Sequence, residues 1–234
     1  FISAKIIKID QNVSNLFIKE YVTPIQTKKY FKKLNWKTVS AFHTRNVPHL
    51  GHEWIHSFCK NQTDGVLIQP LCGQLKSGDY QSQLLINFNK KYVQYYYNKN
   101  YFKVFPLYTF ARYAGPREAL FHCIIRKNYG CSHIYIGRDH AGFADYYEKY
   151  ASQKICKKNE INLGIKILSS NEPVYCNLSK KFHSYRRCCE KEGYLNISGT
   201  KIRKTILENK NIDKRLFRKS FFDQLKNTKN LFVR

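Results

Sequence analysis

One short segment of the chain combines polar residues in a spacing suited to phosphate chemistry. Residues 41–53 read Ala-Phe-His-Thr-Arg-Asn-Val-Pro-His-Leu-Gly-His-Glu, between an apolar run and a helical pattern. At such a strand–turn–helix junction, free backbone N–H groups and the helix dipole both attract anions. His49 and His52, three residues apart on the first helical turn, would face the same anion. The segment therefore predicts a site that holds the phosphates of a nucleotide, the alternative being a turn with surface histidines.

Two further stretches carry residues of the same kind. Residues 137–142 read Gly-Arg-Asp-His-Ala-Gly, and the glycines would let the backbone approach an anion closely. Thr200 precedes a predicted helix, where its hydroxyl and the free N–H groups could hold phosphate oxygens. Arg45 can form a bidentate contact with a tetrahedral oxyanion. The alternatives are a surface loop at 137–142, with Asp139 capping a helix, and an ordinary helix start at Thr200.

Hydrophobic periodicity predicts the elements that would position these loops. Strands are predicted over residues 38–42, 65–69, 104–108, 133–136 and 165–168, and helices over residues 53–60, 80–97, 116–128 and 145–157. This alternation predicts the α/β class, as a Rossmann-like parallel sheet with helices on both faces. Ligands of such sheets bind beyond the carboxyl ends of the strands, so the loops 43–52, 70–79 and 137–142 should meet at one rim.

The two ends of the chain differ from this middle part. A strand is predicted over residues 4–9 and a short helix over residues 27–33. Residues 176–189 look irregular and basic, and a further helix is predicted over residues 201–208. We therefore expect a small irregular and helical C-terminal subdomain. The chain begins at Phe1 and contains no Met, so we expect it to be a segment of a longer protein.

The composition indicates a globular chain with a large excess of positive charge. Hydrophobic residues make up 43% of the sequence, and the formal net charge is +25, which predicts anionic partners. The sequence contains no apolar run of about 18 residues and no signal peptide, so we expect no membrane partner and a cytoplasmic location. The scattered cysteines are typical of reduced thiols.

A basic nucleic-acid-binding module is the alternative to an enzyme. Tyrosines and lysines alternate over residues 90–103, as they do on surfaces that stack bases. No helix-turn-helix, RNP or zinc-finger pattern accompanies them, so we expect small-molecule ligands rather than nucleic acid. The sequence leaves open whether the chain forms a homo-oligomer.

Five strings of residues follow one another in a fixed order between Trp36 and Arg203. They are Thr-Arg-Asn-x-x-His-x-x-His over residues 44–52, Pro-Leu-Cys-Gly-Gln-Leu-Lys-Ser-Gly-Asp over 70–79, Ala-Gly-Pro-Arg-Glu-Ala over 114–119, Gly-Arg-Asp-His-Ala-Gly over 137–142 and Ile-Ser-Gly-Thr-Lys-Ile-Arg over 197–203. Together they resemble the motifs of the ATP sulfurylases (sulfate adenylyltransferases), members of the nucleotidylyltransferase superfamily with a His-x-x-His signature.

The resemblance implies a reaction and a set of site residues. ATP and sulfate would give adenylyl sulfate and pyrophosphate, by direct in-line attack of sulfate on the α-phosphate, with Mg²⁺ bound to the ATP. The implied catalytic residues are Thr44, Arg45, Asn46, His49 and His52. The implied sulfate contacts are His43, Arg45 and Ala141. The implied nucleotide contacts are Asn46, His49, Gly51, His52, Gly137, Arg138, Asp139, His140, Gly199 and Thr200.

The resemblance also implies domain boundaries. Residues 1–33 would be the tail of an upstream N-terminal, PUA-like domain or a linker, and residues 34–168 would form the nucleotidylyltransferase catalytic domain. Residues 169–234 would form the C-terminal subdomain, which completes the site with the Ile-Ser-Gly-Thr-Lys-Ile-Arg string.

Two positions depart from the pattern of the family. His43 stands where Gln, a sulfate ligand, is usual, and Leu50 stands where Arg is common. A neutral His43 can donate one hydrogen bond, which would still allow sulfate to bind. A protonated His43 would bind a dianion more tightly and would make activity sensitive to pH. These departures leave open another acceptor, such as a phosphonate or a sugar phosphate.

Some members of the family also carry a structural zinc ion, bound by three cysteines and a histidine. Cys176 and Cys188 match two of those positions, but Ser179 and Glu192 occupy the other two. A closed zinc site needs four good ligands, so we do not expect zinc, although a neighbouring cysteine or histidine could substitute.

Overall fold

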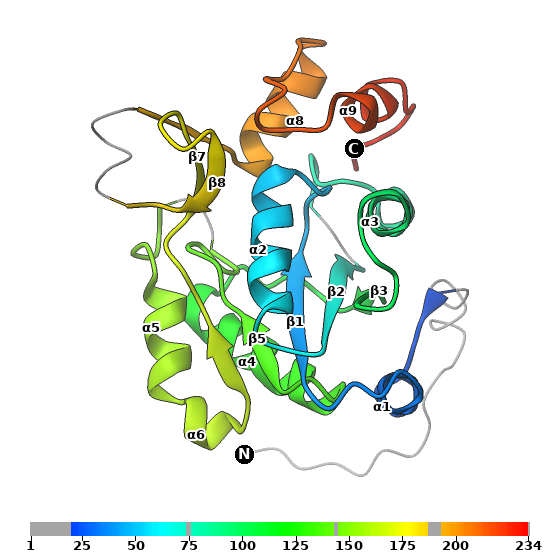
Figure 1. Cartoon of the computed structure of the whole chain (residues 1–234), viewed down its shortest axis with the longest axis vertical. Coiled ribbons are helices and arrows are strands. Elements are labelled where there is room, and N and C mark those ends of the chain that lie inside the picture. Colours follow the sequence, from blue (N-terminus) through cyan, green and yellow to red (C-terminus); the bar gives the residue numbers. More distant parts are fainter. Residues whose placement is uncertain (1–19, 74–75, 143–144, 187–192, 234) are drawn as a thin grey trace.

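The computed structural model describes residues 20–73, 76–142, 145–186 and 193–233 (Figure 1). Its centre is a parallel sheet with the strand order β3-β2-β1-β5-β6, in which β4 also pairs with β2. The strands are β1 (Val39–Thr44), β2 (Gly65–Cys72), β3 (Phe102–Val104), β4 (Leu107–Tyr108), β5 (His133–Tyr135) and β6 (Lys166–Leu168). The predicted α/β class is confirmed, and β3 and β4 replace the single strand expected at 104–108. The strand expected over residues 4–9 lies outside the described residues.

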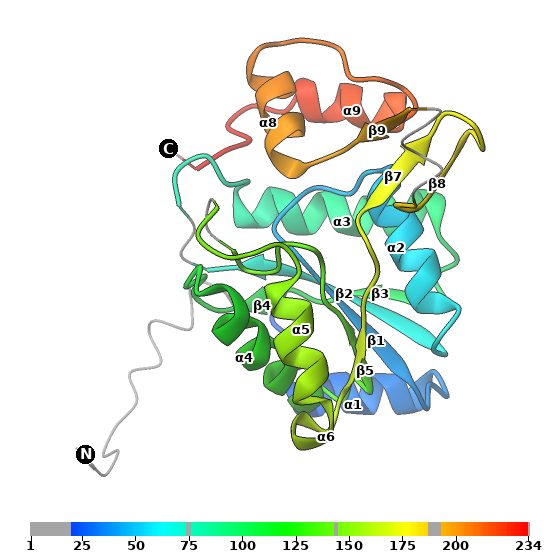
Figure 2. The same ribbon diagram turned by 90° about the vertical axis from the view of Figure 1, so that its left-hand side faces the viewer.

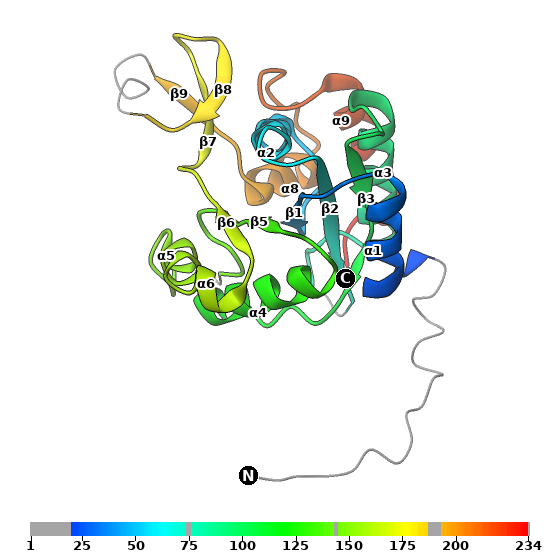
Figure 3. The same cartoon turned by 60° about the horizontal axis from the view of Figure 1, so that its bottom comes forward.

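Helices cover both faces of this sheet (Figure 3). One face packs against α1 (Pro24–Lys33), α4 (Gly115–Asn128), α5 (Ala151–Lys158) and the short α6 (Glu160–Leu163), and the other against α2 (Leu50–Lys60) and α3 (Ser82–Tyr96). Every residue of β2 is buried as a result, and so is every residue of β1 except His43. Such continuously buried strands are typical of parallel sheets that are covered on both sides.

Two helices begin at residues other than those predicted, for local reasons. α2 begins at Leu50, earlier than predicted, because the side chain of His49 accepts the backbone N–H of His52 and caps the helix. α5 begins only at Ala151, directly after Tyr150, whose φ of +67° interrupts right-handed helical geometry. Asp139 therefore caps none of the helices in the described ranges.

The C-terminal part contains a sheet that the sequence analysis did not predict. β7 (Pro173–Cys176), β8 (Lys181–Ser184) and β9 (Tyr194–Asn196) form an antiparallel sheet in the order β8-β7-β9. The expectation of an irregular segment over residues 176–189 is therefore wrong where β8 runs. β7 buries alternate residues, but a pattern of only four residues is too short to distinguish a strand from a turn.

The C-terminal helices lie beyond the carboxyl ends of the central strands (Figure 2). α8 (Gly199–Leu207) agrees closely with the predicted helix, whereas α9 (Lys219–Lys226) has no counterpart in the expectations. Together with α3 and the loop after β1 they form a second core of Val47, Tyr80, Leu85, Phe88, Tyr92, Ile202, Phe217, Phe221, Phe222, Leu225 and Leu231. This core fixes α8 beside the loop that follows β1. None of the helices in the described ranges has the length and apolar character needed to cross a bilayer.

Candidate functional site

A polar cavity opens at the carboxyl ends of β1 and β5, where the chain leaves neighbouring strands toward opposite sides of the sheet. β2 lies on one side of β1 and β5 on the other, so the loops that follow β1 and β5 diverge at this point. Ligands of open α/β sheets bind in such a crevice. The residues that line it are Phe42, His43, Thr44, Arg45, Asn46, His52, Ile55, Tyr135, Gly137, Asp139, His140 and Ala141. Two of the three loops expected at one rim therefore share this cavity.

Thr44 shapes the loop after β1. Its hydroxyl donates to the carbonyl of Asn46 and accepts the N–H of Asn46, both at 3.0 Å. This pair of hydrogen bonds closes a tight turn, and Thr44 itself is buried. The turn places Arg45 and Asn46 in the wall of the cavity.

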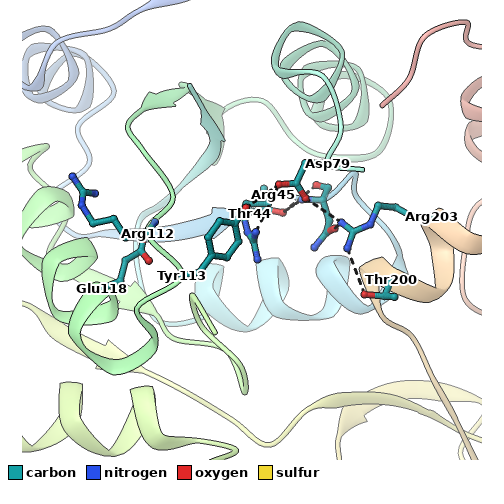
Figure 4. Close-up of polar contacts among 9 residues, drawn as sticks. Thr44, Arg45, Asp79, Arg112, Tyr113, Glu118, Thr200 and Arg203 are labelled. Carbon is teal, nitrogen blue, oxygen red and sulfur yellow. Dashed lines mark hydrogen bonds and ion pairs between the residues drawn. The ribbon is translucent and has the colours of Figure 1, made fainter. Parts of the chain in front are cut away.

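Asp79 joins the third loop to the same wall (Figure 4). Its carboxylate is 2% exposed and lies 3.8 Å from Nη1 of Arg45 and 3.7 Å from Nη1 of Arg203. It also accepts a hydrogen bond of 3.1 Å from the hydroxyl of Tyr113. The guanidinium of Arg45 lies over the ring of Tyr113, 4.7 Å from its centroid, which stabilises a cation. Asp79 and Tyr113 therefore fix the charge of Arg45 beside the cavity.

Arg203 connects α8 with the loop after β1. Its Nη1 donates to Oδ1 of Asn46 at 3.1 Å, and its Nη2 donates to the hydroxyl of Thr200 at 3.4 Å (Figure 4). Gly199 packs directly against Asn46, since a Cβ atom at this glycine would lie 2.2 Å from Oδ1 of Asn46. The start of α8 therefore supports the cavity wall without lining the cavity.

His49 and His52 stack on each other at the start of α2. Their ring centroids are 3.7 Å apart, and Nδ1 of His49 accepts the N–H of His52 at 3.3 Å. His52 lines the cavity, whereas His49 is buried behind it. Burial lowers the pKa of His52 to about 3, and burial, followed by His52 and His56, lowers the pKa of His49 well below its usual value. Both rings are therefore neutral at pH 7.

The loop after β5 forms the other side of the cavity. Ala141 has a φ of +59°, and its carbonyl accepts the N–H of Gly115 at 2.9 Å, which ties the loop to the start of α4. Arg138 forms an ion pair with Glu172 and does not line the cavity, in contrast to the other members of residues 137–141.

Behind the cavity, α4 contributes a buried polar cluster. Nη2 of Arg126 lies 2.6 Å from Nδ1 of His43, and Nδ1 of His122 lies 3.0 Å from Nε2 of His140. Nε2 of His122 faces the carboxylate of Glu118 at 3.5 Å. Glu118 also accepts the backbone N–H groups of Arg112 (Figure 4) and Ala114, both at 3.0 Å.

Burial determines the protonation of this cluster. Burial, followed by His122 and Arg126, lowers the pKa of His43 well below its usual value, and the same causes act on His140. Burial lowers the pKa of His122 to about 4, against the opposing effect of Glu118. All three imidazoles are therefore neutral at pH 7. Of the two protonation states considered for His43, burial favours the neutral one.

Three of these histidines lie close enough to share a metal ion. One nitrogen from each of His43, His122 and His140 lies within 4.8 Å of the others. However, Arg126 occupies Nδ1 of His43 and adds a buried positive charge, and His122 and His140 are hydrogen-bonded to each other. These contacts favour a cluster that faces an anion.

The positions considered for zinc are only partly described. Cys176 is buried at the end of β7, where hydrogen bonds from the backbone of Ser179 and from His183 lower its pKa to about 6. Cys188 and Glu192 lie outside the described residues. The expectation that zinc is absent stays a prediction.

The predicted site residues divide into two groups. Those that line the cavity are His43, Thr44, Arg45, Asn46, His52, Gly137, Asp139, His140 and Ala141. Those that adjoin the lining or turn away from it are His49, Gly51, Arg138, Gly199 and Thr200. Five further residues at or behind the cavity wall were not expected from the sequence: Asp79, Glu118, His122, Arg126 and Arg203. Asp79, Glu118 and Arg203 belong to the five strings, but no sequence signal shows that Arg126 and His122 face inward.

Comparisons with known proteins agree with the resemblance noted in the sequence. The family model described as ATP-sulfurylase matches residues 19–228. The chain is 36% identical to a sulfate adenylyltransferase of Thermococcus onnurineus, over 97% of this chain and 60% of that protein. It is 41% identical to a sulfate adenylyltransferase of Ignicoccus hospitalis, over 85% of this chain and 52% of that protein. The chain thus spans little more than half the length of these curated relatives.

A solved structure shares the fold. The structure titled hexameric APS kinase from Thiobacillus denitrificans matches with a TM-score of 0.67 and 15% identity, over 91% of this chain and 40% of that chain. At this identity the similarity concerns the fold alone. The family match, by contrast, includes the strings that form or adjoin the cavity. The chain therefore belongs to the ATP-sulfurylase family.

Proposed function

We propose that this chain carries the catalytic site of a sulfate adenylyltransferase. ATP and sulfate would be converted to adenylyl sulfate and pyrophosphate by in-line attack of a sulfate oxygen on the α-phosphorus. The observation that carries the proposal is the cavity between β1 and β5, where His43, Arg45 and His52 from the segment after β1 meet His140 from the loop after β5. Such an arrangement can hold two anions in contact and stabilise the charge that develops between them.

The phosphates of ATP would lie at the start of α2. The helix N-terminus attracts phosphate oxygens, and His52 presents a neutral ring to the cavity. Oδ1 of Asn46 is engaged by Arg203, so Asn46 would offer its Nδ2 donor to a phosphate. His49 keeps its proton on Nε2, because its Nδ1 accepts the N–H of His52.

Sulfate would lie against His43, Arg45 and the backbone of Ala141. The guanidinium of Arg45 is fixed by Tyr113 and Asp79, so its donor fork needs little reordering to contact a tetrahedral oxyanion. The attack forms a bond between a sulfate oxygen and the α-phosphorus. It breaks the bond between that phosphorus and the bridging oxygen, which leaves with pyrophosphate. It requires no protein nucleophile.

Mg²⁺ would enter the site on the phosphates of ATP. Among the described residues that line the cavity, Asp139 is the only one with a carboxylate. This fits an ion held mainly by substrate phosphates and water, with few protein ligands. Bound there, Mg²⁺ would neutralise charge on the triphosphate. The residues of the chain would orient the two reactants around it.

We also infer a cytoplasmic location. Six cysteines among the described residues are free and buried. Free thiols in such number are typical of a reducing compartment.

The proposal is tested by measuring pyrophosphate release from ATP by the purified protein. We expect release that depends on added sulfate. Release that depends instead on a phosphonate or a sugar phosphate would move the function to another acceptor. A protein that releases no pyrophosphate with any acceptor, but binds nucleic acid in a strongly salt-dependent manner, would be a binding module.

A further inference from the structure

Arg126 is a buried cation with no carboxylate in direct ion-pair contact. Its side chain is 0% exposed, and within the described ranges it forms no ion pair with a carboxylate. Its Nε and Nη1 atoms also have no hydrogen-bond partner there. Against the lowering effect of burial, Glu118 raises the pKa of Arg126, but only from beyond ion-pair distance. A buried charge without a directly paired counter-ion is costly, so a role in the adjoining site would explain its position.

The hydrogen bond between Arg126 and His43 has only one possible direction, with Arg126 as the donor. A guanidinium can donate hydrogen bonds but cannot accept them. The separation of 2.6 Å between Nη2 of Arg126 and Nδ1 of His43 therefore requires a lone pair on Nδ1. A neutral imidazole with a bare Nδ1 carries its proton on Nε2.

Neighbouring rings fix the orientation of His43. Its ring centroid lies 4.4 Å from that of His122 and 5.1 Å from that of His140. His43 also lines the cavity, and Arg126 occupies the nitrogen on the α4 side of its ring. The Nε2–H group is thus the polar atom that His43 can offer to a ligand.

We propose that Arg126 is a positioning residue of the acceptor subsite, which holds His43 as the Nε2–H tautomer and so makes position 43 a pure hydrogen-bond donor. The inference rests on the proposed function, because it assigns the acceptor to this side of the cavity. A donor-only position suits an oxyanion with no proton, such as sulfate. It opposes hydrogen phosphate, whose P–OH group needs an acceptor. The bound dianion would balance the charge of Arg126 further, beyond the long-range effect of Glu118.

The tautomer can be tested without any substrate. Two-bond ¹⁵N–¹H correlation spectra of the labelled protein distinguish protonated from bare imidazole nitrogens, and the signals of His43 are those lost in His43→Gln. We expect a bare Nδ1 and a protonated Nε2 from pH 6 to pH 8. The charged and titratable groups that face His43 are Arg126, His122, His140 and Arg45. A proton on Nδ1, or a titration of His43 within this range, would overturn the inference.

Variants of His43 test the consequence for the anion. In His43→Gln the amide oxygen can accept from Arg126 while the amide nitrogen donates, so the KM for sulfate should stay within about three-fold. In His43→Leu the KM for sulfate should rise about ten-fold, with the KM for ATP nearly unchanged. In His43→Glu the position becomes an acceptor, so the preference for sulfate over inorganic phosphate should fall about ten-fold. Equal sulfate preference in the Gln and Glu variants would contradict the inference.

Variants of Arg126 test the positioning role itself. Arg126→Leu should raise the KM for sulfate about ten-fold and let the Nδ1–H tautomer of His43 appear, whereas Lys127→Leu, exposed on the same helix, should do neither. If Arg126→Leu does not fold, the spectra of the wild type and the His43 variants decide the matter. Sulfate-dependent activity in a wild type whose His43 carries its proton on Nδ1 would refute this inference alone. The expected tautomer in a protein without sulfate-dependent activity would refute the proposed function alone.

Discussion

The guanidinium of Arg203 donates a hydrogen bond to Oδ1 of Asn46, 3.1 Å away, across a sequence separation of 157 residues. This contact joins α8 to the loop after β1 and orients an amide in the cavity wall. The C-terminal part of the chain thereby takes part in the site without lining it. The same guanidinium also lies near Asp79, so one arginine links all three segments.

Loss of Arg203 should therefore impair ATP use more than folding. Arg203→Gln should lower kcat/KM for ATP about 10- to 100-fold, because Asn46 loses the group that orients its amide. Lys204→Gln is the matched control, since Lys204 is 75% exposed on the same helix. Steady-state kinetics with varied ATP would check this. Equal kinetics in the two variants would show that the contact does not matter.

Asp79 should contribute to stability as well as to the site. Asp79→Asn should lower the free energy of unfolding by about 1–2 kcal/mol, because it removes the carboxylate that faces two arginines. The estimate is modest because those arginines are 26% and 22% exposed and therefore partly screened. Urea denaturation measures this value. Asp213→Asn, which breaks an exposed pair with Arg215, should cost less than about 0.5 kcal/mol, and a reversed order would contradict the account.

Acid should destabilise the protein below pH 6.5 through its buried histidines. Burial lowers the pKa of His52 to about 3 and the pKa of His56 well below its usual value. Between the unfolded pKa near 6.5 and the lower folded pKa, the unfolded state binds more protons, so the free energy of unfolding falls as the pH falls. Each such histidine contributes up to about 1.4 kcal/mol per pH unit in this window.

This pH dependence can be measured by urea denaturation between pH 8 and pH 5. His56→Gln should reduce the slope of the free energy of unfolding against pH, below pH 6.5, by close to one proton. The comparison variant is His183→Gln, on β8 outside the cavity. A slope that is the same in the wild type and in His56→Gln would show that His56 titrates normally.

The central fold was predictable because its signals are local. The buried strand β2 is largely apolar, β1 contains the apolar residues Val39, Ala41 and Phe42, and the glycines and prolines between elements mark the loops. The order of strands then places loop residues such as Arg45 and Ala141 at one rim. The antiparallel sheet was missed because its strands are too short for periodicity to be read.

Partners across the fold were not predictable from the sequence. Arg138 carries the charge expected of a phosphate ligand, yet it pairs with Glu172, and nothing local indicates that contact. Arg126 resembles any basic residue near the end of a helix, where cations favour the dipole. Only the packing of α4 on the sheet reveals that it lies beneath His43.

The central claim is that two anions meet at the cavity beside Arg45. The most direct test is sulfate-dependent release of pyrophosphate from ATP by the wild type, Arg45→Gln and Arg112→Gln. Arg112 is a matched arginine, because its guanidinium also stacks on an aromatic ring, 4.8 Å from the centroid of Phe121, but outside the cavity. The account predicts a loss of about 100-fold or more for Arg45→Gln and a change of less than about three-fold for Arg112→Gln. Wild-type activity in Arg45→Gln would contradict it.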